Sequence, residues 1–202
     1  MKKILPLLNI VLIVSAIIGS FCLVVTRDDK IGLILKDASI LLTITAPYWI
    51  EKIFKKKLTP IVKFICILFV FCAHFLGATL EFYNEFAYYD KITHTISGIL
   101  TALLAMLLLK QLDMYHENKI FFNILFIISV TLSVAVCWEF FEYFGNIFFG
   151  GDAQRVAKTG VNDTMQDMLV AFLGSIIVSI LYYIEETKKL NGMVKSFMNG
   201  MK

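Results

Sequence analysis

Charged residues are scarce in this chain of 202 residues. Asp, Glu, Lys and Arg make up 17% of it, whereas hydrophobic residues make up 58%, and the mean hydropathy is +0.77. A soluble domain of this length carries more charge and interrupts its apolar runs more often. The composition therefore excludes an ordinary soluble domain and indicates a protein whose first partner is the lipid bilayer.

Several motifs that would define a chemistry are also missing. The four cysteines lie in apolar segments without a CxxC pair, which disfavours a disulfide framework or a cysteine-based zinc site. There is no Walker-type or dinucleotide-binding glycine motif and no convincing serine-nucleophile arrangement. No low-complexity linker or convincing internal repeat divides the chain, so we expect residues 1–202 to form a single transmembrane helical domain.

What the chain has instead is a series of long apolar runs. A bilayer core about 30 Å thick needs about 20 helical residues at about 1.5 Å each. The sequence therefore predicts an all-α, polytopic membrane protein with a bundle of about six transmembrane helices. The expected helices cover residues 4–26, 32–50, 60–80, 92–109, 120–141 and 165–184. The first run lacks a clean small-x-small cleavage site, so we expect a retained helix and not a signal peptide.

The distribution of Lys and Arg predicts the orientation. With both termini in the cytoplasm, 13 of the 19 basic residues fall on the inner side, as the positive-inside rule requires. Residues 185–202 then form a basic cytoplasmic tail. The same rule accounts for the net charge of +3, so no nucleic-acid partner is expected.

Acidic residues gather on the opposite side, where 11 of the 16 fall. Four helix ends carry polar pairs three or four residues apart, a spacing that keeps both members on one face: Glu81 and Glu85, Asp90 and His94, Glu139 and Glu142, and Asp163 and Asp167. The inner members of two pairs, His94 and Asp167, lie about 6 Å deeper along the helix axis, where polar groups normally face the bundle interior and mark functional sites. The predicted site residues are Asp90, His94, Glu139, Glu142, Asp163 and Asp167. Secondary candidates are His74, Glu81, Arg155 and Lys158.

These residue types suit a divalent metal, because carboxylate and imidazole groups bind Mg²⁺, Mn²⁺ or Zn²⁺. The expected metal ligands are Asp90, His94, Glu139, Glu142 and Asp167. Such a site would support metal-assisted hydrolysis or group transfer on an envelope lipid or lipid-linked substrate at the outer face. A simpler interpretation holds for two of the acids, since Asp90 and Asp163 stand where helix N-caps belong, and Asp163 with Gln166 has capping-box spacing.

Three stretches carry a resemblance to a known group. "YDKITHTISG" (Tyr89 to Gly98), "WEFFEY" (Trp138 to Tyr143) and Asp163 to Met168 with Gly174 resemble, in this order, the motifs of YjdF-type bacterial inner-membrane proteins. These are small polytopic proteins loosely similar to the VanZ-like family, which is associated with tolerance to glycopeptide antibiotics. The resemblance implies a multi-pass protein of the bacterial inner membrane with a role in the cell envelope. It implies no particular reaction.

Two other functions fit the same residues. In an ion- or proton-coupled transporter, the acids would bind cations or relay protons; inverted repeats and interrupted helices would favour this hypothesis, and six short helices would require a homodimer. In a non-catalytic envelope factor, the polar cluster would only join the helix ends.

Overall fold

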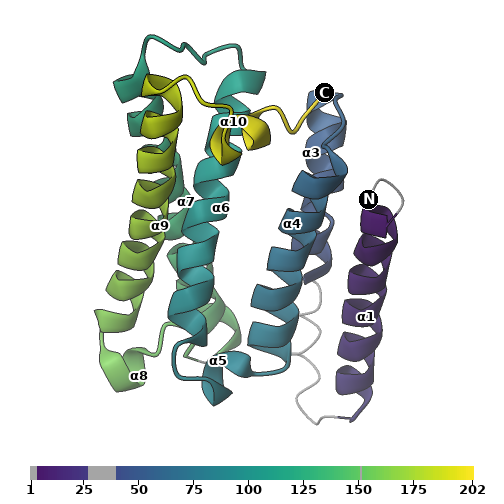
Figure 1. The fold of residues 1–202 in the computed structure, drawn as a ribbon. Coiled ribbons are helices and arrows are strands. Elements are labelled where there is room, and N and C mark those ends of the chain that lie inside the picture. The colour runs from purple at the N-terminus through teal and green to yellow at the C-terminus, as the bar shows by residue number, and fades with distance from the viewer. Residues whose placement is uncertain (1–3, 27–39, 151) are drawn as a thin grey trace. The chain divides into compact units, whose positions relative to one another are not determined.

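The computed structural model describes residues 4–26, 40–150 and 152–202 of the chain (Figure 1). Its contacts divide the chain into two compact units, and each is described by itself. The first comprises residues 1–90 with 200–202, and the second comprises residues 91–199. The boundary falls inside the first turn of one helix, so that helix continues from the end of the first unit into the second.

The first unit is built on α4 and the π-helix η1, which follow each other without a break. Its small apolar core consists of buried residues of α1, η1 and the segment between them, including Ala16, Ile67 and Phe75. α1 runs beside α4 in Figure 1. The helices are α1 (Ile4–Thr26), α3 (Ala46–Phe54), α4 (Pro60–Val70), η1 (Phe71–Thr79) and α5 (Phe82–Glu85).

The second unit consists mainly of three long helices that run side by side (Figure 1). α9 packs along α7, and α10 packs against α9. The helices are α6 (Tyr89–Gln111), α7 (Ile120–Phe149), α8 (Val156–Thr159), α9 (Asn162–Thr187) and α10 (Met193–Met198).

Two glycines allow α6 and α9 to approach each other closely. A methyl group on Gly98 would lie 2.1 Å from the carbonyl oxygen of Ala171, and one on Gly174 would lie 2.6 Å from that of Thr95. Any larger residue would therefore push the two backbones apart. Small residues have this role at many contacts between membrane helices.

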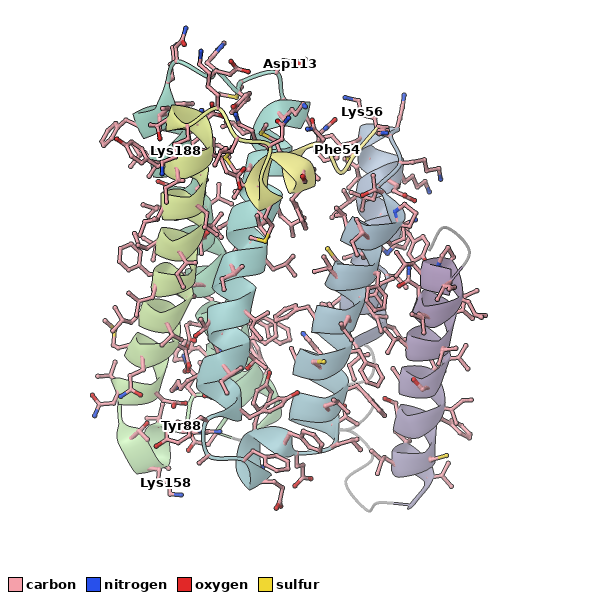
Figure 2. All side chains as sticks on the ribbon, viewed as in Figure 1. Phe54, Lys56, Tyr88, Asp113, Lys158 and Lys188 are labelled. Atoms are coloured by element: carbon pink, nitrogen blue, oxygen red, sulfur yellow. The ribbon has the colours of Figure 1, made fainter. Side chains whose placement is uncertain are left out.

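Five of the described helical segments are long and apolar enough to cross a membrane, which confirms an all-α, multi-pass membrane protein. They are Ile4–Val25, Pro60–Thr79, Tyr89–Gln111, Ile120–Phe148 and Asn162–Thr187. Large apolar side chains along these segments point outward (Figure 2), and Phe121 is 80% exposed, as a lipid-facing side chain would be. Part of the expected helix over residues 32–50 lies outside the described residues. Residues 40–44 are helical, and after a turn at Thr45 the chain continues as α3.

Some helix ends differ from the prediction. α7 was expected to end near residue 141, but it continues to Phe149, so Glu139 and Glu142 lie within it rather than at its end. The apolar residues after Tyr143 sustain the helix until Gly150, whose φ of 76° ends it. The capping prediction for Asp163 is wrong, because Val161 is the N-cap of α9 and Asp163 lies in its first turn. Asp90 likewise lies inside the first turn of α6.

The predicted tail over residues 185–202 has an ordered structure. α9 continues to Thr187, and α10 buries Val194, Phe197 and Met198. The buried carboxylate of Glu185 accepts hydrogen bonds from the first backbone N–H groups of α10. The last residues, 200–202, pair with residues 57–59 of the first unit.

Candidate functional site

The starts of α6 and α9 carry the polar residues that the sequence singled out. On α6, Asp90 and His94 are one turn apart, and on α9, Asp163 and Asp167 are one turn apart. Each pair therefore lies on one face of its helix. Because Gly98 and Gly174 bring the two backbones together just beyond these residues, the polar faces meet.

The side chain of Lys91 lies where these two polar faces meet. Its ammonium Nζ donates hydrogen bonds to Oδ1 of Asp163 and Oδ1 of Asp167, both at 2.7 Å. The guanidinium Nε of Arg155 lies 3.9 Å from the other oxygen, Oδ2, of Asp163. The side chains of Asp163 and Asp167 are only 7% and 4% exposed. Buried carboxylates of this kind need a cationic or hydrogen-bonding partner, which Lys91 and Arg155 supply.

A second grouping shares one of these acids. Asp90, His94 and Asp167 each offer a ligand atom, and these three atoms lie within 4.8 Å of one another. Nε2 of His94 lies 3.9 Å from Oδ1 of Asp167. Ligand atoms about 2.0 to 2.6 Å from one cation cannot be farther apart than about 5 Å, so the spacing is compatible with a shared metal ion.

The two glutamates of α7 have other partners. Glu139 is buried, and the side-chain amide of Gln154 donates to its Oε2 at 3.1 Å and to its carbonyl oxygen at 3.3 Å. Glu142 accepts a hydrogen bond from the indole N–H of Trp138, one turn earlier, at 2.8 Å. Neither belongs to the close group of Asp90, His94 and Asp167. Among the described contacts, Asp90, His94 and Asp167 come together, and Lys91 joins Asp163 to them.

The secondary candidates fall in different places. His74 lies within the π-helix η1, and Glu81 follows it with a positive φ of 63°; both belong to the first unit. Arg155 reaches the site through Asp163, whereas Lys158 is exposed on α8 at the same end of the second unit (Figure 2).

The predicted set lacks two residues that contact its acids, Lys91 and Gln154. Lys91 lies three residues before His94, which places it near the same face of α6. That spacing was a usable signal. Gln154 carried no such signal, because it lies between helices and its partner Glu139 is 15 residues away.

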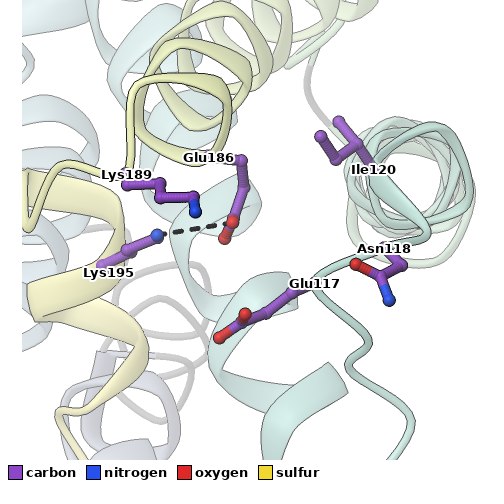
Figure 3. Close-up of a pocket in the computed structure, with 6 residues that line it drawn as sticks. All are labelled: Glu117, Asn118, Ile120, Glu186, Lys189 and Lys195. Atoms are coloured by element: carbon purple, nitrogen blue, oxygen red, sulfur yellow. Dashed lines mark ion pairs between the residues drawn. The ribbon is translucent and has the colours of Figure 1, made fainter.

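A polar pocket of about 480 Å³ lies at the opposite end of the second unit (Figure 3). Within it, Nζ of Lys195 lies 3.3 Å from Oε2 of Glu186, and the hydroxyl of Tyr115 also donates to Glu186. Burial and this hydrogen bond raise the pKa of the Tyr115 phenol, so it stays a donor. The Lys195 pair joins α10 to the end of α9, and the Tyr115 hydrogen bond joins the segment between α6 and α7 to the same end. The lining residues are Glu117, Asn118, Ile120, Glu186, Lys189 and Lys195.

The fold and the site together define a class: a multi-pass helical membrane protein with a polar cluster near the point where two of its spanning helices begin. The cluster consists of Asp90, Lys91, His94, Arg155, Asp163 and Asp167. The chain belongs to the family described as "Predicted membrane protein (DUF2238)", whose profile matches residues 7–188. This match includes both helices that carry the cluster. Comparisons with curated proteins and with solved structures returned no match.

Proposed function

We propose that this protein is a YjdF-type enzyme of the bacterial inner membrane that acts on an anionic envelope lipid or lipid-linked substrate. Its reaction is metal-assisted hydrolysis or group transfer at the outer face. The observation that carries this proposal is the convergence of Asp90, His94 and Asp167 within 4.8 Å, next to the two cationic groups of Lys91 and Arg155.

The donor set fits a divalent cation. Two carboxylates and one imidazole suit Mg²⁺, Mn²⁺ or Zn²⁺, and such an ion would polarise a phosphoryl or carbonyl oxygen and activate water. Asp90, His94 and Asp167 would hold it. Asp163 would act as a positioning residue, because it fixes Lys91 and Arg155 beside the ligands.

The depth of the cluster fits a lipid substrate. All of its members on α6 and α9 lie in the first two turns of spans that begin at Tyr89 and Asn162. Lipid headgroups occupy this depth at the edge of the hydrocarbon core. A headgroup could therefore reach the site without leaving the bilayer. The excess of Lys and Arg in the inner loops supports an outward-facing site.

The test combines metal analysis with a hydrolysis assay. Protein purified in detergent is loaded with Mn²⁺, washed and analysed for bound metal, and then supplied in liposomes with phospholipids and lipid-linked phosphates. We expect about one metal ion per chain and release of a headgroup or phosphate. The variants His94→Ala and Asp167→Ala should lose both, whereas His116→Ala, on an exposed histidine outside the cluster, should lose neither.

One result would contradict the proposal, and a second measurement would then identify the alternative. If the natural protein retains no metal and changes none of the lipids, the enzyme hypothesis fails. If, in addition, Asp167→Asn lowers thermal stability, the cluster serves to join α6 to α9, as in a non-catalytic envelope factor.

A cation- or proton-coupled transporter is the second candidate, and one observation favours it. Residues Phe71–Thr79 form a π-helix that interrupts the span Pro60–Thr79 and carries His74. Helix interruptions of this kind are frequent at functional sites and at the binding sites of transporters. Flux into proteoliposomes that disappears in His74→Ala or Glu139→Gln, without any lipid turnover, would support transport instead of catalysis.

A further inference from the structure

Lys91 stands where it competes with any cation bound by the cluster. Its ammonium lies 2.7 Å from Oδ1 of Asp167, and the same oxygen lies 3.9 Å from Nε2 of His94. Oδ1 of Asp167, which the ammonium binds, thus belongs to a carboxylate of the group formed by Asp90, His94 and Asp167. A divalent ion at its usual distance from that oxygen would lie within about 5 Å of the ammonium, where like charges repel strongly.

The net charge of the cluster indicates which kind of ion it attracts before and after a metal ion binds. Asp90, Asp163 and Asp167 contribute three negative charges, and Lys91 and Arg155 contribute two positive charges, so the cluster has a net charge of −1 when His94 is neutral. It therefore attracts a cation first. Once a divalent ion is bound, the net charge becomes +1, and the cluster then attracts an anion.

We infer that Lys91 is an exchangeable counter-ion: a divalent metal displaces its ammonium from Asp167, and the released ammonium, with Arg155, binds a phosphate group of the substrate. This inference rests on the proposed function and adds an order of binding, metal before anion. It also names the substrate class, a phosphorylated lipid or lipid-linked phosphate.

The surroundings of Lys91 allow this movement. Its side chain is 22% exposed, so its neighbours do not enclose it fully. Asp163 retains a cationic neighbour when Lys91 moves, because Arg155 lies 3.9 Å from its Oδ2. A long lysine stem can also swing while its backbone stays in the helix.

The experiment follows the reactivity of Lys91 in the full natural chain, so no variant has to fold. Detergent-solubilised protein is labelled briefly with an amine-acylating reagent, and labelling of each lysine is quantified by peptide mass spectrometry, first alone, then with Mn²⁺, then with Mn²⁺ and inorganic phosphate. We expect Mn²⁺ to increase the labelling of Lys91 severalfold and phosphate to reverse the increase. Lys158, exposed on α8, is the control and should not respond. Replacing inorganic phosphate by short-chain phosphatidate distinguishes free phosphate from a lipid headgroup.

A variant provides a second, independent measurement. Lys91→Met removes the competing charge and keeps most of the side-chain volume, so it should bind Mn²⁺ on the order of tenfold more tightly, as expected for a coupling between two ligands of one site. Lys158→Met should bind Mn²⁺ like the natural chain.

The possible failures are distinguishable. If Mn²⁺ binds but Lys91 labelling does not change, the exchange is refuted and the metal site stands. If neither the natural chain nor Lys91→Met binds Mn²⁺, both the exchange and the proposed metal site are refuted. If only Lys91→Met binds it, Lys91 fills the site permanently, which also refutes both.

Discussion

The contact between α6 and α9 at Gly98 gives the most direct test of the structure. Substitution of Gly98 by alanine would place a methyl carbon 2.1 Å from the carbonyl oxygen of Ala171, whereas ordinary contacts begin at 3.4 Å. The obstacle is backbone, which cannot rotate away as a side chain can. The two helices would therefore have to separate locally by about 1.3 Å.

The expected cost follows from this separation. Overpacking a close contact typically costs about 1–3 kcal/mol, and we expect the upper part of this range because neither backbone can yield. Alanine recovers some of the loss through its helix propensity, by about 1 kcal/mol or less. At about 2–4 °C per kcal/mol, the melting temperature should fall by roughly 4–8 °C. Because Gly98 is one turn beyond His94, bound metal should decrease as well.

The assay is the fraction of detergent-solubilised protein that still elutes as a monodisperse peak after heating to a series of temperatures. Gly145→Ala, in α7, is the matched control, since a methyl group there meets nothing within 4 Å. It should be neutral or slightly stabilising. If Gly98→Ala is as stable as Gly145→Ala, α6 and α9 do not approach each other as described.

Three further predictions concern buried carboxylates. Burial alone would raise the pKa of Glu51, but hydrogen bonds from Lys63 and the N–H of Leu58 lower it below its ordinary 4.5. The ionised Glu51 therefore stabilises the fold at neutral pH, and this stabilisation is lost as the pH falls through the lowered pKa. Glu51→Gln should flatten this part of a profile of thermal stability against pH. If the variant loses stability in acid as the natural chain does, Glu51 is not the group responsible. Glu185→Ala removes the acceptor of two N–H groups of α10, so trypsin should cleave after Lys195 faster than in the natural chain; an equal rate would show that Glu185 does not hold the tail. Gln154→Leu removes a donor to the buried carboxylate of Glu139 and should cost about 1.5–3 kcal/mol. A double variant with Glu139→Leu should recover stability, and no recovery would mean that the two side chains act independently.

Both the site and the tail depend on the pairing of buried charges. Lys91, Arg155 and Gln154 neutralise or solvate acids of α7 and α9, and Glu185 orders the start of α10. In a membrane protein such pairs have a second consequence, because an acid near the hydrocarbon core is tolerated only with a partner. The acids of the WEFFEY stretch (Trp138 to Tyr143) illustrate this. Glu139 and Glu142 lie inside a continuous helix, each with a donor from a neighbouring side chain.

The sequence alone was sufficient to predict what depends on local composition and period. Long apolar runs imply helices that can cross a bilayer, since a lone segment in lipid must satisfy its own backbone hydrogen bonds. Helical spacing likewise placed Asp90 with His94, and Asp163 with Asp167, on shared faces.

Only the tertiary structure decided which faces meet. Lys91 pairs with acids 72 and 76 residues away, and Gly98 contacts the backbone of Ala171; no local pattern encodes either partner. Local sequence also does not decide whether Asp163 caps its helix or forms an ion pair, because its partner Lys91 belongs to another helix. The physical reason is that hydropathy and period fix the direction of a side chain within its own helix, whereas its partner is fixed by the close packing of backbones that only the folded chain brings together.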